Sequence, residues 1–314
     1  MGKYILKRLG IAAVTILIIL LILFVLLEFM PGTPFDMTEG NITDEQIKVL
    51  YAKYGLDKPI LYRFVLYVKN MLSGDFGVSY VIQNNMPISQ MLEGRLTLSI
   101  KIGAQAMLIG AFFGLILGVF AALKHNTPLD SFATLLSMIG ASVPSYVFAL
   151  GLAYIFAFKL KLVPLLYNSD KEFVSTILPT VALSFSPIAS IARYSRTEMI
   201  EVMDSDYIQL AESKGLSRLA VICRHGLRNA MITILTIMGP MLVGLMTGST
   251  VVETIFSVPG VGNLFVNALQ VNDYNVAITL AFLFSAEYIL MMLLVDILYG
   301  IIDPRIRVAG GKKS

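Results

Sequence analysis

Six stretches of mainly apolar residues follow one another along the chain, and each is long enough to cross a lipid bilayer. No residue from Leu9 to Leu27 is charged. A helix needs roughly 20 such residues to cross about 30 Å of hydrocarbon. The pattern therefore predicts an all-α integral membrane protein with six transmembrane helices, the other five at about Thr97–Leu123, Ser131–Phe158, Phe173–Ala192, Ala230–Val252 and Val276–Ile302.

The composition agrees with a protein embedded in lipid and limits the kinds of chemical site that the chain can hold. Hydrophobic residues make up 56% of the 314 residues and charged residues only 14%, against roughly 25% charged in a soluble domain. One cysteine and two histidines predict neither a disulfide framework nor a metal site. The sequence contains no GxxxxGK[ST], HExxH or GxSxG motif. We therefore expect no enzyme and no cofactor bound by this chain, and any nucleotide chemistry to belong to another chain.

The distribution of basic residues predicts the orientation. Six spans place both termini on one side, and 14 of the 24 Lys and Arg lie on that side. Most of the other basic residues belong to one long loop, where the positive-inside rule carries little weight. Lys3, Lys7 and Arg8 precede a first span that is longer than a signal-peptide core. We expect an uncleaved first helix and two cytoplasmic termini.

The external loop, residues 31–95, is too long for a simple turn and should contain two short amphipathic helices. Thr43 and Gln46 form a capping box for the first helix, which Gly55 ends. The second helix starts at Pro59 and stops near Gly74. Two interpretations are equally open: a docking surface for an external partner, or a cap that only packs on the helix bundle.

Two spans contain residues that call for protein or water beside them. Glycines repeat along one face of the second span, and this pattern favours tight helix packing over a role in a pore; they are Gly103, Gly110, Gly114 and Gly118. In the fourth span, two prolines should break the hydrogen-bond ladder and hydroxyls accompany them, so its backbone should face protein or water. Candidates for a translocation path are Pro179, Ser184, Ser186 and Pro187.

Two carboxylates lie within the sixth span. Glu287 and Asp296 are nine positions apart, on opposite faces of a helix, and cannot act as one pair. An ionisable group in a span suggests function by default. Structural pairing inside the bundle is nevertheless favoured over a proton relay, because no His or Lys lies at the same depth.

The longest cytoplasmic segment runs from Arg193 to Arg228 and mixes basic and acidic residues. Asp206 and Gln209 form a capping box, apolar residues follow, and Gly215 is a C-terminal stop. The pattern predicts a helix of about eight residues, about 12 Å long. Such a helix would suit a lever for a cytoplasmic partner or a simple surface connection, and the residues alone do not separate the two.

The string SDYIQLAESKGLSRLAVICRHGLRNAMITIL, Ser205 to Leu235, resembles the cytoplasmic "EAA" loop of ABC importer permeases of the oligopeptide, dipeptide and nickel family. Further blocks are similar to that family in order: MGKYILKRLG, MPGTPFD, YGLDKPI, SGDFGVSY, VVETIFSVPGVGNLFVNAL and VDILYGIIDPRIR. The likeness covers essentially the whole chain. The arrangement resembles the first, B-type, permease subunit of oligopeptide systems.

The resemblance implies a type I ABC importer permease fold in a bacterial cell membrane, with a structured external loop. It implies a tail and first helix over 1–30, the external loop over 31–95, a five-helix core over 96–302 with a coupling loop at 193–229, and a tail at 303–314. Residues that would contact an ATPase are Asp206, Tyr207, Gln209, Ala211, Glu212, Lys214 and Gly215. The chain departs from the common motif at Gln209, Leu210 and Thr233. We expect the first two departures to leave coupling intact, and the third to affect only the start of the fifth helix.

The resemblance also implies the partners: a second homologous permease, two ABC ATPases that bind ATP and Mg²⁺, an extracellular peptide-binding lipoprotein and the bilayer, without nucleic acid. Oligopeptide import is the expected function. Dipeptide, haem-precursor or nickel import is the alternative within the family. A stand-alone secondary transporter or channel is the alternative from another class, and an intramembrane enzyme has the least support.

Overall fold

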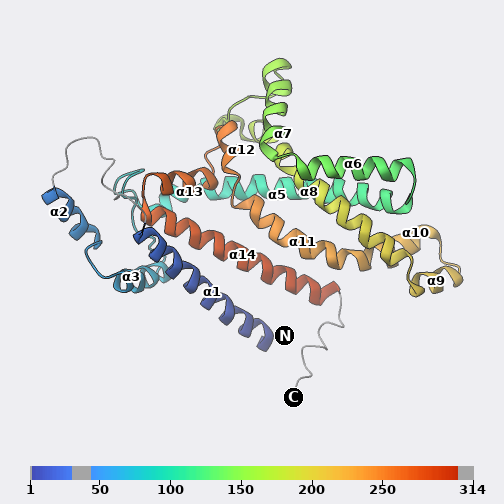
Figure 1. Cartoon of the computed structure of the whole chain (residues 1–314), viewed down its shortest axis with the longest axis horizontal. Helices are drawn as coiled ribbons and strands as arrows, with labels where there is room; N and C mark the ends of the chain where they lie inside the picture. Colours follow the sequence, from blue (N-terminus) through green and yellow to red (C-terminus); the bar gives the residue numbers. More distant parts are fainter. Residues whose placement is uncertain (1, 30–43, 303–314) are drawn as a thin grey trace. The chain divides into compact units, whose positions relative to one another are not determined.

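The structure is a computed structural model that describes residues 2–29 and 44–302 (Figure 1). Regular structure in this part of the chain is helical, apart from one isolated antiparallel bridge between Val78 and Pro87. The chain divides into two compact units, the first from the described parts of Met1–Leu98 and Pro259–Ile289, the second from Ser99–Val258 and the described residues after Leu290.

The first unit contains α1 (Gly2–Glu28), α2 (Asp44–Tyr54), α3 (Ile60–Leu72), α4 (Ile88–Leu92), α13 (Val261–Gln270) and the first half of α14 (Tyr274–Ile302). The second unit contains most of α5 (Arg95–Leu123), followed by α6 (Pro128–Ser142), α7 (Ser145–Leu152), the π-helical η1 (Ala153–Lys159), the 3₁₀ turn η2 (Ser169–Lys171), α8 (Glu172–Met203), α9 (Asp206–Ser213), α10 (Arg218–Ala220), the π-helical η3 (Val221–Leu227), α11 (Arg228–Met246) and α12 (Thr250–Ile255).

Within residues 2–29 and 44–302, five helical stretches are long and apolar enough to cross a membrane, or six when one bent pair is counted as a span. The bent pair corrects the third predicted span, because α6 and the α7–η1 stretch meet at 97° instead of forming one helix. Pro144 explains the bend. It has no N–H to donate, and it forces Val143 into an extended conformation with ψ 123°.

The fourth and fifth spans also differ from expectation. The prediction that Pro179 and Pro187 break the fourth span was wrong, since α8 continues through both to Met203. Packing from neighbouring helices allows prolines inside such a span. The fifth span was expected to continue to Val252, but α11 ends at Met246, and Gly248 then takes a left-handed φ of +84°.

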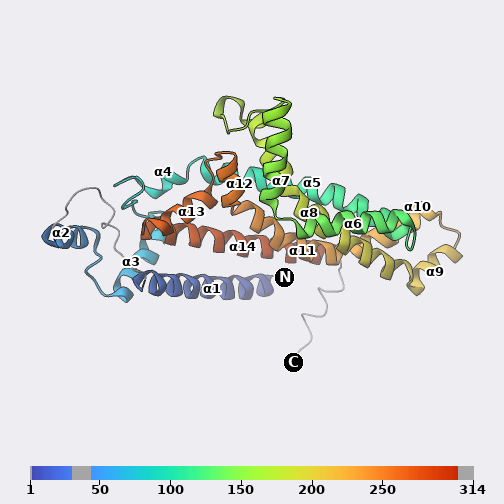
Figure 2. The same ribbon diagram turned by 45° about the horizontal axis from the view of Figure 1, so that its top comes forward.

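The first unit has two apolar clusters, both touching the start of α14. In one, Phe24 of α1, Tyr67 of α3 and Ile278 of α14 pack together, and α1 lies beside the first half of α14 in Figures 1 and 2. In the other, α4 and α13 pack on α14 around the fully buried Leu280. The apolar face predicted for α3 is therefore directed at the helices. The capping box predicted at Thr43 lies outside the described residues.

A buried carboxylate fixes the loop between α3 and α4. Asp273, with no exposed surface, accepts hydrogen bonds from the Ser79 hydroxyl at 2.5 Å and from three successive backbone N–H groups, those of Tyr80, Val81 and Ile82, at 3.0–3.1 Å. A buried charge is tolerated when its acceptor sites are filled in this way. The loop is thereby tied to the residue that precedes α14.

The second unit is built on close contact between α5 and α8. A Cβ atom on Gly110 would lie 2.5 Å from Cβ of Pro187, and one on Gly114 would lie 2.8 Å from Cβ of Ile191. Gly118 faces Ser195 in the same way. These glycines let the two backbones approach more closely than any side chain would permit.

The carboxylates of the sixth span differ from the favoured interpretation. Both carboxylate oxygens of Glu287 are buried, and neither has a hydrogen-bond partner among the described residues. The pairing inside the bundle that the sequence favoured is therefore not present there. The side chain of Asp296 lies outside the described part of the chain.

Candidate coupling surface and translocation face

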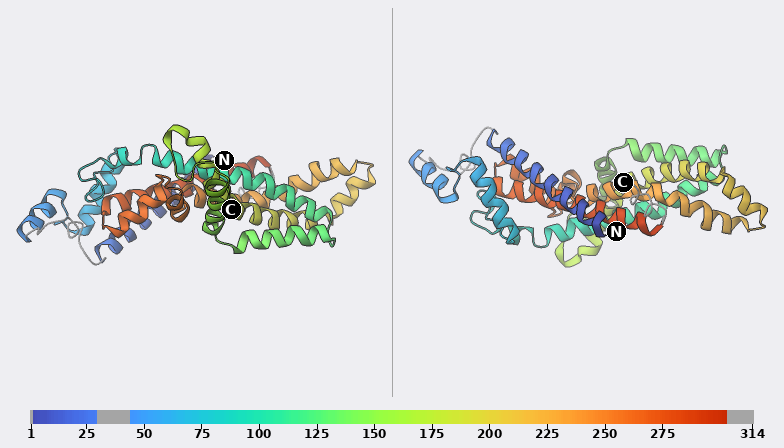
Figure 3. Two further views of the ribbon diagram at one scale, coloured as in Figure 1. Left: turned by 90° about the horizontal axis from the view of Figure 1, so that it is seen from above. Right: turned by 90° about the horizontal axis from the view of Figure 1, so that it is seen from below.

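The predicted short helix of the cytoplasmic segment is α9, which lies at the far end of the second unit beside α10 (Figures 1 and 3). Its start differs from the predicted capping box. Ser205 is the N-cap, and its backbone carbonyl accepts from the N–H groups of Ile208 and Gln209. Asp206 is the first helical residue, where a carboxylate suits the positive end of the helix dipole.

The end of α9 matches the predicted stop. Gly215 has a φ of +79°, its N–H bonds to the carbonyl of Glu212, and the N–H of Leu216 reaches back to the carbonyl of Ala211. This pair of bonds is a Schellman motif, in which the residue after the helix must be left-handed. A side chain with a branched Cβ is strained in that conformation.

One face of α9 is buried and the other is exposed. Ile208 and Ala211 are 1% and 5% exposed and pack against Val221 of η3, with Met203 of α8 beside them. The remaining residues predicted to contact an ATPase are all exposed; they are Asp206, Tyr207, Gln209, Glu212, Lys214 and Gly215. The helix therefore has a fixed inner face and a free outer face.

The outer face of α9 and the residues after it carry apolar side chains in solvent. Tyr207 is 44% exposed, Leu210 is 56% exposed and Leu219 in α10 is 72% exposed. Exposed polar and charged residues such as Gln209 and Glu212 lie beside them. Apolar side chains gathered at an exposed tip, rimmed by polar ones, are typical of a protein-binding surface.

An ion cluster that sequence reasoning missed holds α8 to the α5–α6 turn. Arg196 of α8 binds both oxygens of Asp130 on α6, at 2.5 and 2.8 Å, and Asp130 is 4% exposed. His125 Nδ1 lies 3.3 Å from Asp130 Oδ2, which also accepts the N–H of Asn126 at 3.0 Å. A forked guanidinium–carboxylate pair fixes both distance and orientation.

The cluster lies two turns before α8 ends, and only Asp204 and Ser205 separate α8 from α9. Asp130 occurs in the first turn of its helix, where a carboxylate is common. Arg196 occurs within a basic stretch of the cytoplasmic segment. Neither position singles out the pair, so only the packing of α6 on α8 shows it.

The four residues predicted for a translocation path fall on different faces of α8. Pro179, Ser184 and Pro187 are buried within the second unit, and the Ser184 hydroxyl donates to the carbonyl of Val181 at 2.8 Å. Ser186 is exposed. Of these four, Ser186 alone lies on the surface of the chain.

Two family models together match nearly the whole chain. The model described as "Binding-protein-dependent transport system inner membrane component" matches residues 114–308, and the one described as "Binding-prot-dependent transport system membrane comp, N-term" matches residues 1–96. The chain belongs to this family. It is a multi-pass membrane protein and the permease subunit of an ABC importer, in which separate ATPase subunits hydrolyse ATP and a separate protein binds the substrate. Membership removes the stand-alone carrier and the intramembrane enzyme from consideration.

Curated relatives match end to end. The dipeptide transport system permease protein DppB of Lactococcus lactis subsp. cremoris (strain MG1363) is 41% identical over 98% of this chain and 100% of its own length. DppB of Bacillus subtilis (strain 168) is 39% identical over 98% of both chains. The oligopeptide transport system permease protein OppB of Escherichia coli (strain K12) is 40% identical over 98% of this chain and 100% of its own length.

Two solved structures share the fold. The MetNI methionine ABC transporter in an inward-facing conformation aligns with a TM-score of 0.55 at 15% identity, over 68% of this chain and 97% of that chain. An amino acid ABC transporter aligns with a TM-score of 0.53 at 17% identity, over 67% and 93%. Together with the helical structure, these alignments confirm the predicted type I importer permease fold.

The left-handed end of α9 gives the first prediction. Gly215→Val should strain the backbone by about 1–2 kcal/mol and loosen the end of the helix. In the reconstituted importer, we expect substrate-stimulated ATP hydrolysis and uptake to fall together. Gly215→Asn is the matched control, because asparagine tolerates a left-handed conformation. Wild-type uptake by Gly215→Val would show that this geometry is dispensable.

The ion cluster gives the second prediction. Arg196→Ala, Asp130→Asn and the double variant should show a coupling free energy of about 0.5–3 kcal/mol in thermal unfolding of the purified complex. Arg196→Ala leaves a buried carboxylate short of its main partner, so it should cost more than the exposed control Arg193→Ala on the same helix. Additive effects of the two single substitutions would mean that the pair does not couple α6 to α8.

Proposed function

We propose that this chain is one of two homologous transmembrane subunits of an ATP-driven importer of oligopeptides. Its relatives with full-length similarity are named as oligopeptide and dipeptide permeases. Dipeptide import is the second candidate, because two of those relatives, at 39–41% identity, are named for dipeptides. Both substrates have a polar backbone and variable side chains, which calls for a wide and hydrated path.

The observation that carries the coupling role is the two-faced α9. Its inner face is buried on η3 and α8, and its outer face exposes Tyr207 and Leu210. In the proposed assembly this outer face fits into a groove on one of two ABC ATPases. Movement of the ATPase would be transmitted to α8, because α9 follows α8 after two residues and shares its apolar cluster.

The orientation that goes with this role places both chain termini and α9 in the cytoplasm. It is supported by the excess of Lys and Arg in the short connections on that side. The loop of residues 31–95 and its helices α2 and α3 then lie outside the cell. An extracellular peptide-binding lipoprotein would deliver its cargo from that side.

The exposed side of α8 supports a path shared with a second permease. Ser186, a hydroxyl within this span, is exposed there. Polar groups within a span favour a neighbouring protein or water over lipid. In the proposed cycle, ATP binding closes the ATPases, and the two permeases switch the path between inward and outward access.

The two faces of α8 give the third prediction. In a Cys223→Ala background, a cysteine replacing the exposed Ser186 should react with a water-soluble thiol reagent, because only a hydrated thiolate reacts quickly. A cysteine replacing Ser184, which is 1% exposed, should stay protected. Equal protection of both positions through the whole ATP cycle, while a loop cysteine reacts, would remove α8 from the path.

Reconstitution tests the function itself. The chain, a second permease, two ATPases and the binding protein are placed in proteoliposomes and given a labelled dipeptide, a labelled pentapeptide or Ni²⁺. We expect ATP-dependent uptake of the pentapeptide and none by this chain alone. Leu210→Glu should abolish uptake and copurification of the ATPases, since it puts a charge on the exposed apolar tip of α9. Ser213→Glu, at an exposed position of α9 outside the predicted contact residues, is the control.

Each outcome distinguishes one alternative. Uptake of the dipeptide in preference to the pentapeptide would support the second candidate, and uptake of Ni²⁺ alone would contradict peptide import. Pentapeptide movement by the isolated chain without ATP would contradict the importer mechanism.

A further inference from the structure

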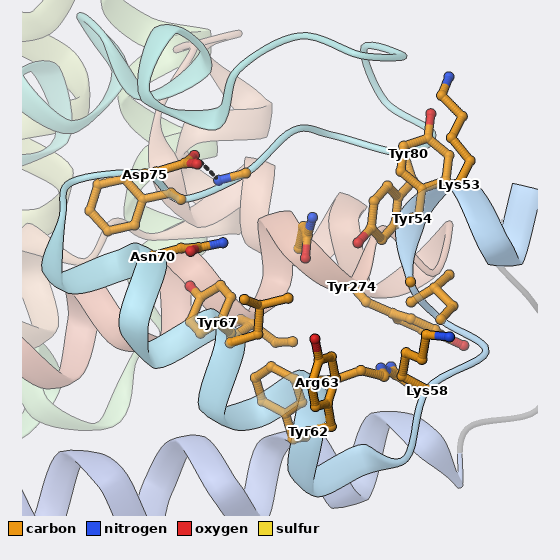
Figure 4. Close-up of a pocket in the computed structure, with 18 of the residues that line it drawn as sticks. Lys53, Tyr54, Lys58, Tyr62, Arg63, Tyr67, Asn70, Asp75, Tyr80 and Tyr274 are labelled. Atoms are coloured by element: carbon orange, nitrogen blue, oxygen red, sulfur yellow. Dashed lines mark hydrogen bonds between the residues drawn. The ribbon is translucent and has the colours of Figure 1, made fainter.

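A cavity of about 390 Å³ lies inside the first unit, between α1, α2, α3, the loop after α3 and the start of α14 (Figure 4). This is within the range of roughly 300–1,000 Å³ that is usual for small-molecule sites. Among the residues that line it, five are tyrosines: Tyr54, Tyr62, Tyr67, Tyr80 and Tyr274. The chain has 14 tyrosines in 314 residues, so this wall is strongly enriched in phenol side chains.

The depth of the cavity follows from the two spans that contribute to it. Phe24 lies three residues before the first span ends at Leu27, about 4–5 Å along the helix. Ile278 lies four residues after the start of the last span at Tyr274, about 6 Å along that helix. The headgroup layer of a bilayer is about 5–7 Å thick on each side. The cavity therefore opens at the level where lipid headgroups meet the acyl chains.

Positive charge dominates the lining. Three of the charged residues that line the cavity are basic, Lys53, Lys58 and Arg63, and one, Asp75, is acidic. In Figure 4, Lys58 and Arg63 lie at one end of the cavity and Asp75 at the other. The Asp75 oxygen already accepts the N–H of Gly77 at 2.9 Å. Lys58 also has Asp57 at 3.1 Å, but more than half of its side chain is exposed.

The cavity is held open by contacts in its walls. The N–H of Tyr80 is fixed by the buried carboxylate of Asp273 at 3.1 Å, and the Tyr67 hydroxyl shares a hydrogen bond of 3.0 Å with Thr279. Burial raises the pKa of Tyr67 to about 12 and raises the pKa of Tyr80 as well. Both phenols therefore stay neutral at physiological pH and do not repel an anion. A site formed before binding loses little entropy when it is filled.

We propose that this cavity binds the phosphodiester headgroup of an anionic membrane phospholipid, with Lys58 and Arg63 at the phosphate and the tyrosines around the glycerol backbone. Basic side chains beside aromatic rings at this depth suit such a group. An acidic segment of a partner protein is the competing occupant. The lipid is favoured because the floor of the cavity is formed by two membrane spans, at Phe24 and Ile278. The inference does not depend on which solute the importer carries.

The test counts lipids bound to the assembled importer by native mass spectrometry. The complex is purified from vesicles of equal parts phosphatidylglycerol and phosphatidylcholine. We expect the wild type to retain phosphatidylglycerol preferentially. Lys58→Gln and Arg63→Gln should each lower that preference about fivefold, as expected for loss of one basic contact near an anionic surface. Lys69→Gln is the matched control, because Lys69 is exposed on α3, the helix of Arg63, but does not line the cavity.

Two variants are needed because Arg63 also interacts with its neighbours. If only Arg63→Gln loses the lipid, the cavity has been deformed and the proposal fails. Equal retention of both lipids by the wild type would also overturn it. Displacement of the lipid by millimolar inorganic phosphate would identify a soluble phosphate as the ligand. Displacement by the binding protein, with a crosslink to Tyr62→Cys, would identify the competing protein occupant.

Discussion

The contact between α5 and α8 is the constraint on which the second unit depends. Gly110, Gly114 and Gly118 leave bare backbone at three positions on the α5 side of this contact, and Pro187, Ile191 and Ser195 of α8 fit against them. The hydrophobic effect does not drive helices together in lipid, because lipid tails are as apolar as the side chains. Close van der Waals contact between the helices must stabilise their association instead. Because α8 is held along its length, its exposed face and its connection to α9 have a defined position.

The buried polar groups show a second common feature. Asp273 is surrounded by four donors, and Asp130 by a guanidinium and a backbone N–H. Ser99 donates to the buried Glu253 at 2.9 Å. Each of these carboxylates joins segments that are far apart in the sequence. The hydrogen bonds it accepts offset the cost of removing its charge from water and hold the two segments together. Glu287 stands apart, since no described residue satisfies it.

Much of the fold could be predicted from the sequence, because hydrophobic length and periodicity act locally. Five spans and the extents of α3 and α9 follow from apolar runs and from glycine stops such as Gly74 and Gly215. The main errors arise where packing between distant segments overrides a rule that holds for a local sequence. Pro179 and Pro187 were read as helix breakers, but packing against α5 keeps α8 continuous. Ser205, not Asp206, is the N-cap residue of α9, and its hydroxyl donates to the carbonyl of Val202 in the preceding helix. The Asp130–Arg196 pair joins positions 66 residues apart, and no pattern within one segment could reveal it.

The bend at Pro144 has a consequence for how the protein enters the membrane. The helix before it, α6, has 15 residues, and α7 with η1 has 8 and 7. Each arm is therefore about 22 Å long, less than the ~30 Å of hydrocarbon. Neither arm can be released into the bilayer as an independent straight helix during synthesis. Both instead dock on α8, α6 through Gly140 against Ala189 and α7 through the stacked rings of Phe148 and Phe185, 4.1 Å apart. Because α8 follows both arms in the sequence, the bent pair has its packing partner only once α8 has been synthesised.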